Sequence, residues 1–259
     1  MRGLSLGSLY ALSAIGFVLL FRTGGIVNLA HGQLMAMGAF IFLVLYGSMG
    51  DGFIIVFLLT VLICLIMILV IEWLLIRPLY PIDIKRAIFA TLGIMLMLKG
   101  VIPSVSLPSV EAVSRGEGID TVHMCILGAG IISVISFLLM FKRSSLGLYI
   151  RAVGDNRKAA LSIGIPIKKM LTFTGVFSGL AAVISGVLMI IGSGMNAAEL
   201  GPMEARIFPS IVLGGLGSMR GAIIGGVLMG MLEICAGGKA SGPLRDLLPY
   251  LVLLVVLLI

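Results

Sequence analysis

Few residues in this chain could do chemistry, and most of them lie inside apolar sequence. The segment Asn28-Leu29-Ala30-His31-Gly32 places an amide and an imidazole at the start of an apolar stretch. His31 has no second ligand three or four residues away, so we expect no metal site. Polar side chains in such surroundings either line a pathway or bond one helix to another. Two interpretations of Asn28 and His31 therefore remain: they line a substrate pathway, or they connect two helices by hydrogen bonds.

Isolated charges interrupt other apolar stretches. Lys99 and Glu233 each stand alone, whereas Glu72 is followed by Arg77, with which we expect it to pair. A charge at the centre of a membrane helix costs about 2.5–3.5 kcal/mol, so such residues usually face the interior of a bundle. For Lys99 and Glu233, structural pairing and a substrate pathway both remain open.

A glycine-rich run from Leu213 to Ser218 breaks the apolar region 207–236. Backbone that leaves helical geometry at membrane depth is tolerated only where protein or a water-filled cavity satisfies it. The region is either a pair of short helices that enter and return from outside or a loop that reaches the cytoplasm. The candidate residues for a translocation path are Asn28, His31, Lys99, Gly214, Gly215, Gly217 and Glu233.

Motifs of enzyme catalysis are missing from the sequence. Gly238-Lys239-Ala240 lacks the first glycine and the final hydroxyl residue of a phosphate-binding loop. Gly215 and Gly217 are followed by Arg220, where a dinucleotide fingerprint needs glycine. We expect no catalytic residue, no cofactor and no enzyme activity. Any work that this chain does must be driven by another chain or by an ion gradient.

Lipid must be the solvent for most of the chain. Hydrophobic residues occupy 60% and charged residues 11% of the 259 positions, whereas about a quarter of a soluble domain is charged. The mean hydropathy is +1.24. So little charge cannot cover a surface that faces water. The composition predicts an all-α integral membrane protein.

Apolar stretches of about 20 residues, enough to cross a bilayer, define about eight transmembrane segments. They are 4–21, 26–47, 53–76, 87–107, 123–141 and 170–191, then the glycine-broken region 207–236 and a final run from 246. The final run is short for a span, so we expect the natural chain to continue beyond Ile259. Residues 1–259 are predicted to form a single polytopic transmembrane domain.

The distribution of charge orients these segments. Basic residues far outnumber the single acid, Asp155, between Phe141 and Met170, and Arg22 and the loop 77–86 are basic as well. The positive-inside rule makes these loops cytoplasmic, which places the N-terminus outside. The net charge of +7 is then a topology signal and gives no reason to expect a nucleic acid partner.

The cytoplasmic loop 142–169 is longer than a topology signal requires. Residues 151–161 can form a short helix, after which Gly164 supplies a stop and Pro166 a restart. A short helix with basic edges and an apolar face suits docking into a groove on a cytoplasmic partner. A basic loop that only sets topology is the alternative.

Several blocks of the sequence, in order, resemble one family. Residues 3–12, 28–32, 151–166 and 213–218, together with Gly221-Ala222 and Arg245-Asp246, are similar to ABC-type branched-chain amino-acid permeases. Leu29 stands where the family often has phenylalanine, and the family's usual polar C-terminal tail is missing.

This resemblance implies a membrane subunit of an importer in the inner or plasma membrane of a prokaryotic cell. Its partners would be a second homologous permease subunit, a pair of cytoplasmic ATP-binding subunits and an extracytoplasmic substrate-binding protein. The implied substrate is a branched-chain amino acid. The loop would couple to the ATPase through Arg151, Ala159, Ala160, Leu161, Gly164 and Pro166.

Other functions remain open. Relatives with similar motifs move urea, short amides or other amino acids, and the external binding protein largely sets specificity. An ion-coupled secondary transporter would show inverted repeats and a central acidic residue, and we find no clear example of either. A scaffold subunit would not need the broken segment 207–236.

Overall fold

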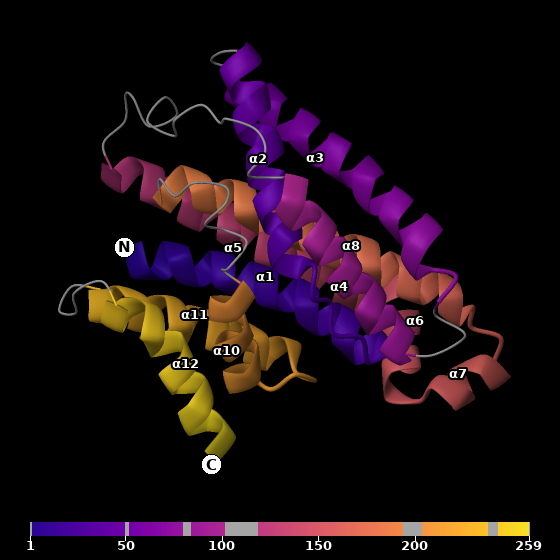
Figure 1. Ribbon diagram of the computed structural model, residues 1–259. Coiled ribbons are helices and arrows are strands. Elements are labelled where there is room, and N and C mark those ends of the chain that lie inside the picture. The colour runs from indigo at the N-terminus through magenta and orange to yellow at the C-terminus, as the bar shows by residue number, and fades with distance from the viewer. Residues whose placement is uncertain are drawn as a thin grey trace.

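A computed structural model describes residues 2–49, 52–79, 84–101, 119–193, 204–237 and 243–258 (Figure 1). Within these ranges the regular structure is helical and no strand is present, as an all-α membrane protein requires. The helices are α1 (Arg2–Gly24), α2 (His31–Met49), α3 (Phe53–Ile71), the π-helical turn η1 (Glu72–Ile76), α4 (Ile84–Val101), α5 (Ile119–Arg143), α6 (Ser145–Asp155), α7 (Arg157–Ser162), α8 (Ile167–Ser193), α10 (Glu204–Gly214), α11 (Met219–Gly237) and α12 (Pro243–Leu258).

Helix α1 lies at the centre of the bundle. It contacts α5 and α8 on one side and α10 and α11 on the other (Figure 1). Small residues allow the closest of these approaches: Gly7 lies against Val227, and Gly230 lies against the backbone of Gly7. Lipid supplies no hydrophobic drive between helices, so close packing of this kind supplies much of their association. Some of the 35 glycines in the sequence therefore allow neighbouring helices to pack closely around α1.

Among the described residues, five helices are long and apolar enough to cross a membrane. They are Arg2–Gly24, His31–Met49, Phe53–Ile76, His123–Arg143 and Ile167–Gly192. Helix α10 has only 11 residues, about 16 Å at 1.5 Å per residue, which is roughly half of the hydrocarbon core. A multi-pass membrane protein is therefore confirmed, whereas the predicted count of about eight segments is not.

The outer faces of α3 and α5 suit contact with lipid tails. Only 22% of each of these two spans is buried inside the protein. Large apolar side chains such as Ile54 and Trp73 are more than half exposed on α3 and its π-helical turn. In water such faces would aggregate, but in a bilayer they match their solvent.

The second predicted segment starts too early. The apolar stretch predicted a span from residue 26, but α2 begins at His31 and residues 25–30 are not helical. Gly25 has a φ of 67°, which ends α1. The side chain of Asn28 then accepts a hydrogen bond from the N–H of Ala30, a local turn that competes with helix formation.

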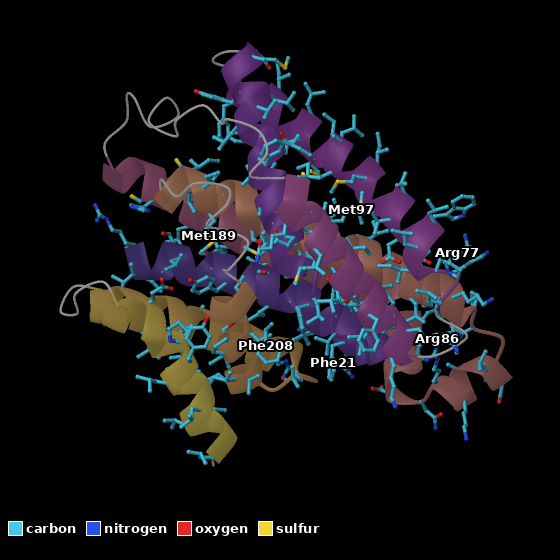
Figure 2. All side chains as sticks on the ribbon, viewed as in Figure 1. Phe21, Arg77, Arg86, Met97, Met189 and Phe208 are labelled. Carbon is cyan, nitrogen blue, oxygen red and sulfur yellow. The ribbon has the colours of Figure 1, made fainter. Side chains whose placement is uncertain are left out.

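The basic segments gather at one end of the bundle. Arg22, near the end of α1, forms a 2.9 Å ion pair with Asp155 at the end of α6. Arg77 and Arg86 lie at the same end as α6 and α7 (Figure 2). An exposed ion pair contributes about 0–1 kcal/mol, so the helix topology brings these segments together. The described basic residues of the predicted cytoplasmic loops thus lie on one side, and their cytoplasmic location stays a prediction.

Candidate translocation and coupling sites

The glycine run of the sequence is a sharp turn between α10 and α11. Gly215, which follows the last residue of α10, has a φ of 84°, and Ser218 donates its N–H to the Gly215 carbonyl at 3.0 Å. Gly214 and Gly221 face each other so closely that a β-carbon on either would overlap the other's backbone. Gly217 is exposed in the turn and has open space around its α-carbon. The predicted helix break is therefore confirmed.

His31 connects α2 to the middle of α1. Its Nε2 shares a 2.9 Å hydrogen bond with Ser13 Oγ, and its ring meets Phe17 edge-on. His31 is 1% exposed, and its Nδ1 has no hydrogen-bond partner among the described residues. The contact supports the reading of His31 as a tie between helices. It also means that α2 begins deep inside the bundle and not at its surface.

The non-helical segment before α2 is held from α4. The N–H of Leu29 donates to Thr91 Oγ1 at 3.1 Å, and Thr91 is fully buried. Asn28 is 6% exposed and bonds within its own turn. Backbone outside a helix survives at this depth because protein groups satisfy it.

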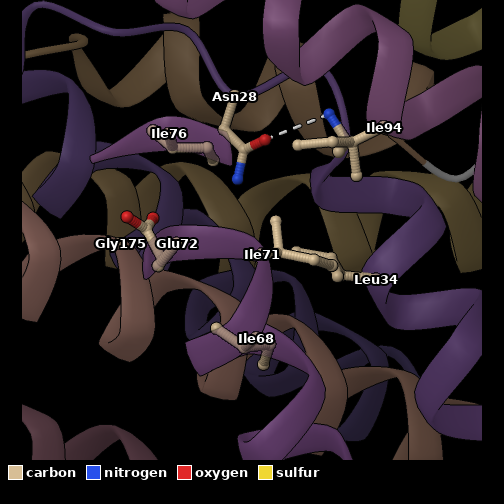
Figure 3. Close-up of a pocket in the computed structure, with 9 residues that line it drawn as sticks. Asn28, Leu34, Ile68, Ile71, Glu72, Ile76, Ile94 and Gly175 are labelled. Atoms are coloured by element: carbon tan, nitrogen blue, oxygen red, sulfur yellow. Dashed lines mark hydrogen bonds between the residues drawn. The ribbon is translucent and has the colours of Figure 1, made fainter. Parts of the chain in front are cut away.

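A small cavity lies where this segment meets α3, η1, α4 and α8 (Figure 3). Its volume is about 20 Å³, room for about one water molecule. Asn28 and Glu72 supply its polar side chains. The other lining residues are Ala30, Leu34, Ile68, Ile71, Ile76, Ile94 and Gly175.

Glu72 points into the bundle from the first position of η1. It is 3% exposed, and a β-carbon at position 175 of α8 would overlap its carboxylate. The described bond between Glu72 and Arg77 joins their backbones, from the Arg77 N–H to the Glu72 carbonyl at 2.7 Å. Turns of π-helix occur frequently at functional sites. Glu72 therefore joins the candidate residues, although its sequence context suggested only a pair with Arg77.

The other two charged candidates lie in different surroundings. Glu233 of α11 is 1% exposed and accepts a hydrogen bond from the hydroxyl of Tyr10 on α1. Lys99 lies near the end of α4 and is exposed. Asn28 lines the cavity, and His31 lies three residues later at the first position of α2. Glu233, Lys99 and the glycine turn are not among the residues that line the cavity. The seven path candidates thus do not form one site.

The loop 142–169 contains two helices instead of the single one predicted at 151–161. Asn156 adopts an extended conformation between α6 and α7, and its side chain accepts the N–H of Ala159 at 3.0 Å. A capping asparagine of this kind starts a new helix, which is why the predicted helix is broken. Gly164 has a φ of 80° and α8 begins directly after Pro166. The predicted stop and restart are confirmed.

Two of the six predicted coupling residues face inward. Ala160 is 2% exposed, and its carbonyl accepts the N–H of Ile165 at 3.0 Å. Arg151 donates to the carbonyl of Phe141 at 2.6 Å, and its guanidinium lies over the Phe141 ring. Both residues hold the loop to the bundle. Large exposed apolar side chains of the loop include Leu148 on α6, at 58%, Leu161 at the end of α7, at 58%, and Ile163 after it, at 75%.

Comparison with known families decides what this bundle is. The family described as the permease component of branched-chain amino acid transport systems matches residues 1–257. This chain belongs to that family. The resemblance found in the sequence blocks is thereby confirmed over nearly the whole chain.

The permease is similar to several characterised or named proteins. The high-affinity branched-chain amino acid permease LivH of Salmonella typhimurium is 27% identical, over 99% of this chain and 91% of the relative. BraD of Pseudomonas aeruginosa is 29% identical over the same shares of both chains. A probable ABC transporter permease of Escherichia coli is 28% identical over 58% of this chain and 48% of its own. No solved structure matches the permease.

Sequence reasoning missed two residues of interest in the permease. Ile163 directly precedes the Gly164 stop, so its place in the turn after the predicted helix was readable from the sequence, whereas its exposure was not. No signal in the sequence shows that Glu72 faces Gly175, since the two are brought together only by the packing of α3 on α8.

Proposed function

We propose that this permease is the membrane subunit of an ATP-driven importer for branched-chain amino acids. It would pair with a second permease subunit, receive substrate from an extracytoplasmic binding protein and be driven by a pair of cytoplasmic ATPases. The N-terminus would lie outside the inner membrane of a prokaryotic cell. The turn at 215–218 and the buried polar residues would line or shape the path.

The observation that carries the coupling role is the exposed apolar pair Leu161 and Ile163. Both project from the end of α7 and the turn after it, at the end of the bundle where the basic segments gather. Lys158, Lys168 and Lys169 flank them in sequence and are exposed. Large apolar side chains beyond the lipid-facing surface mark an interaction site. Because the sequence has no nucleotide motif, energy from ATP must reach the bundle by contact at such a surface.

Charge substitutions at this pair test the proposal. Leu161→Glu and Ile163→Glu should each weaken association with the ATPase about tenfold or more, since burial of such a side chain contributes about 1.5–3 kcal/mol. Ser162→Glu is the matched control because Ser162 is exposed in the same turn and its hydroxyl bonds only the carbonyl of Lys158. Substitution of Ala160 would instead disrupt the permease's own packing.

The measurements are substrate-stimulated ATP hydrolysis in reconstituted vesicles and a pull-down of the ATPase. Loss of both in the two apolar variants, with little change in Ser162→Glu, supports coupling through this surface. Unchanged stimulation in all three would leave the loop as a topology signal.

The substrate is tested separately. Leucine, isoleucine and valine uptake that requires ATP and the binding protein supports the proposal. Uptake of urea or short amides in their place would assign the permease to another branch of its family. Uptake driven by an ion gradient without ATP would favour the secondary-transporter alternative.

A further inference from the structure

The structure points to a substrate contact inside a single permease subunit. We propose that the cavity between Asn28 and Glu72 is the closed form of a transit site for an aliphatic amino acid. This inference rests on the proposed function, because it takes the substrate class from there. It adds the residues that would recognise each part of the substrate.

The acidic wall would recognise the ammonium group. Glu72 places a carboxylate in the cavity at 3% exposure, and the side chain of Asn28 lies on the opposite wall (Figure 3). A carboxylate buried in a membrane protein is costly and usually marks an ion or substrate path. Gly175 makes its placement possible, since any side chain there would occupy the space of the carboxylate. The side-chain oxygen of Asn28 already accepts the N–H of Ala30 at 3.1 Å, so the carboxylate of Glu72 would be the acceptor for the N–H groups of an ammonium ion.

The start of α2 would recognise the substrate carboxylate. Ala30 and Leu34, which flank the first turn of α2, both line the cavity. The N–H groups of Ala30 and His31 already bond oxygens of Asn28, so this helix start would act through the positive end of its dipole, which favours an anion. Glu72 and this helix start therefore place a negative and a positive pole around one space. A zwitterion carries the complementary pair of charges.

The remaining wall would recognise a branched aliphatic side chain. Ile68, Ile71, Ile76 and Ile94 supply it from α3, η1 and α4. These side chains have no hydrogen-bonding group, so a polar substrate side chain would lose its water without compensation. The combination of two poles and an aliphatic wall matches leucine, isoleucine and valine.

The cavity must widen before it can hold such a substrate. At about 20 Å³ it accepts one water molecule, so the structure represents the closed form. Two irregular backbone segments border it, the non-helical residues 25–30 and the π-helical turn at 72–76. Both depart from regular α-helical geometry, so we expect α2 and α3 to bend at these segments when the cavity widens.

Photolabelling of the assembled transporter tests this site. The probe is a diazirine analogue of leucine, added to vesicles that hold the permease, its ATPase and its binding protein, and irradiated during ATP turnover. Competition-sensitive label should appear on peptides of α2 and α3 that contain the cavity lining, and excess leucine should remove it. Glu72→Gln should lower both label and uptake about tenfold, the loss expected for one charge-assisted hydrogen bond.

Two further variants separate a substrate contact from a structural role. Gly175→Ala displaces the carboxylate of Glu72 and should also lower the label, whereas Gly128→Ala, which meets open space on α5, should not. The substrate-independent association of each variant with the ATPase shows whether its bundle has folded. Folded variants with undiminished label would overturn the site.

The outcome also distinguishes this inference from the proposed function. If the probe is transported but labels only other segments, the transit site is wrong and the importer function stands. If neither leucine nor the probe is transported with ATP, the proposed substrate class fails and the site fails with it.

Discussion

The hydroxyl of Tyr10 donates a hydrogen bond to a carboxylate oxygen of Glu233 at 2.5 Å, across 223 positions of sequence. Both side chains are buried, at 0% and 1% exposure, where α1 packs against α11. The bond therefore resists rotation of one helix against the other. It also gives Glu233 a structural role, the link between α11 and α1, that does not depend on contact with a substrate.

Removal of this hydroxyl should destabilise the bundle. Tyr10→Phe keeps the ring and deletes the donor to a buried carboxylate, which costs about 1–3 kcal/mol. Tyr149→Phe is the control, because Tyr149 is 42% exposed on α6. The measurement is the thermal unfolding midpoint in detergent. Equal midpoints for Tyr10→Phe and the parent would show that the bond contributes nothing.

The glycine contact between α1 and α11 should tolerate no side chain. In Gly230→Ala the added methyl would overlap the backbone of Gly7, and the forced separation should cost about 1–3 kcal/mol. Gly128→Ala adds the same methyl on α5 with nothing within 4 Å. Detergent-solubilised Gly230→Ala should unfold at a lower temperature than Gly128→Ala. A reversed order would mean that α1 and α11 do not meet as described.

Alanine substitution should have different effects at the two exposed glycines of the turn between α10 and α11. Gly215 has a φ of 84° while Gly217 is not among the glycines with positive φ, and neither has an atom within 4 Å of a built β-carbon. Gly215→Ala should therefore cost about 1–2 kcal/mol of backbone strain, and Gly217→Ala much less. We expect Gly215→Ala to insert normally and to transport more slowly than Gly217→Ala. Matching transport rates in the two variants would make the turn an ordinary loop.

The proposed topology places Ser48 and Ser162 on opposite sides of the membrane. Ser48 lies near the end of α2 and Ser162 ends α7, and both are exposed. Single cysteines at these positions should react with a membrane-impermeant maleimide in intact cells at Ser48 only. Cys125 and Cys235 are exposed and must first be replaced by serine. Labelling of Ser162 from outside would reverse the orientation and move the coupling surface away from ATP.

The sequence by itself determined the class of this protein. Scarce charge and long apolar stretches require lipid as solvent, because water-facing surfaces need polar cover. Basic residues on alternate loops, the glycine break at 214–217 and the stop and restart at Gly164 and Pro166 are local signals. They were readable because each depends on the chemistry of a few neighbouring residues. Family membership followed from the same blocks.

Only the tertiary structure decided which candidate residues are buried and which residues they contact. Ala160 and Leu161 are neighbours in sequence, yet one is buried and the other exposed, because the bundle covers one side of α7. Asn28 interrupts an apolar stretch that reads as helix, since a side-chain bond to the N–H of Ala30 outweighs the local preference. Glu72 meets Gly175 across more than a hundred residues through the packing of α3 on α8. The hydropathy of the sequence does not predict such distant contacts. In lipid, the helix surfaces that face a neighbouring helix and those that face the bilayer are equally apolar.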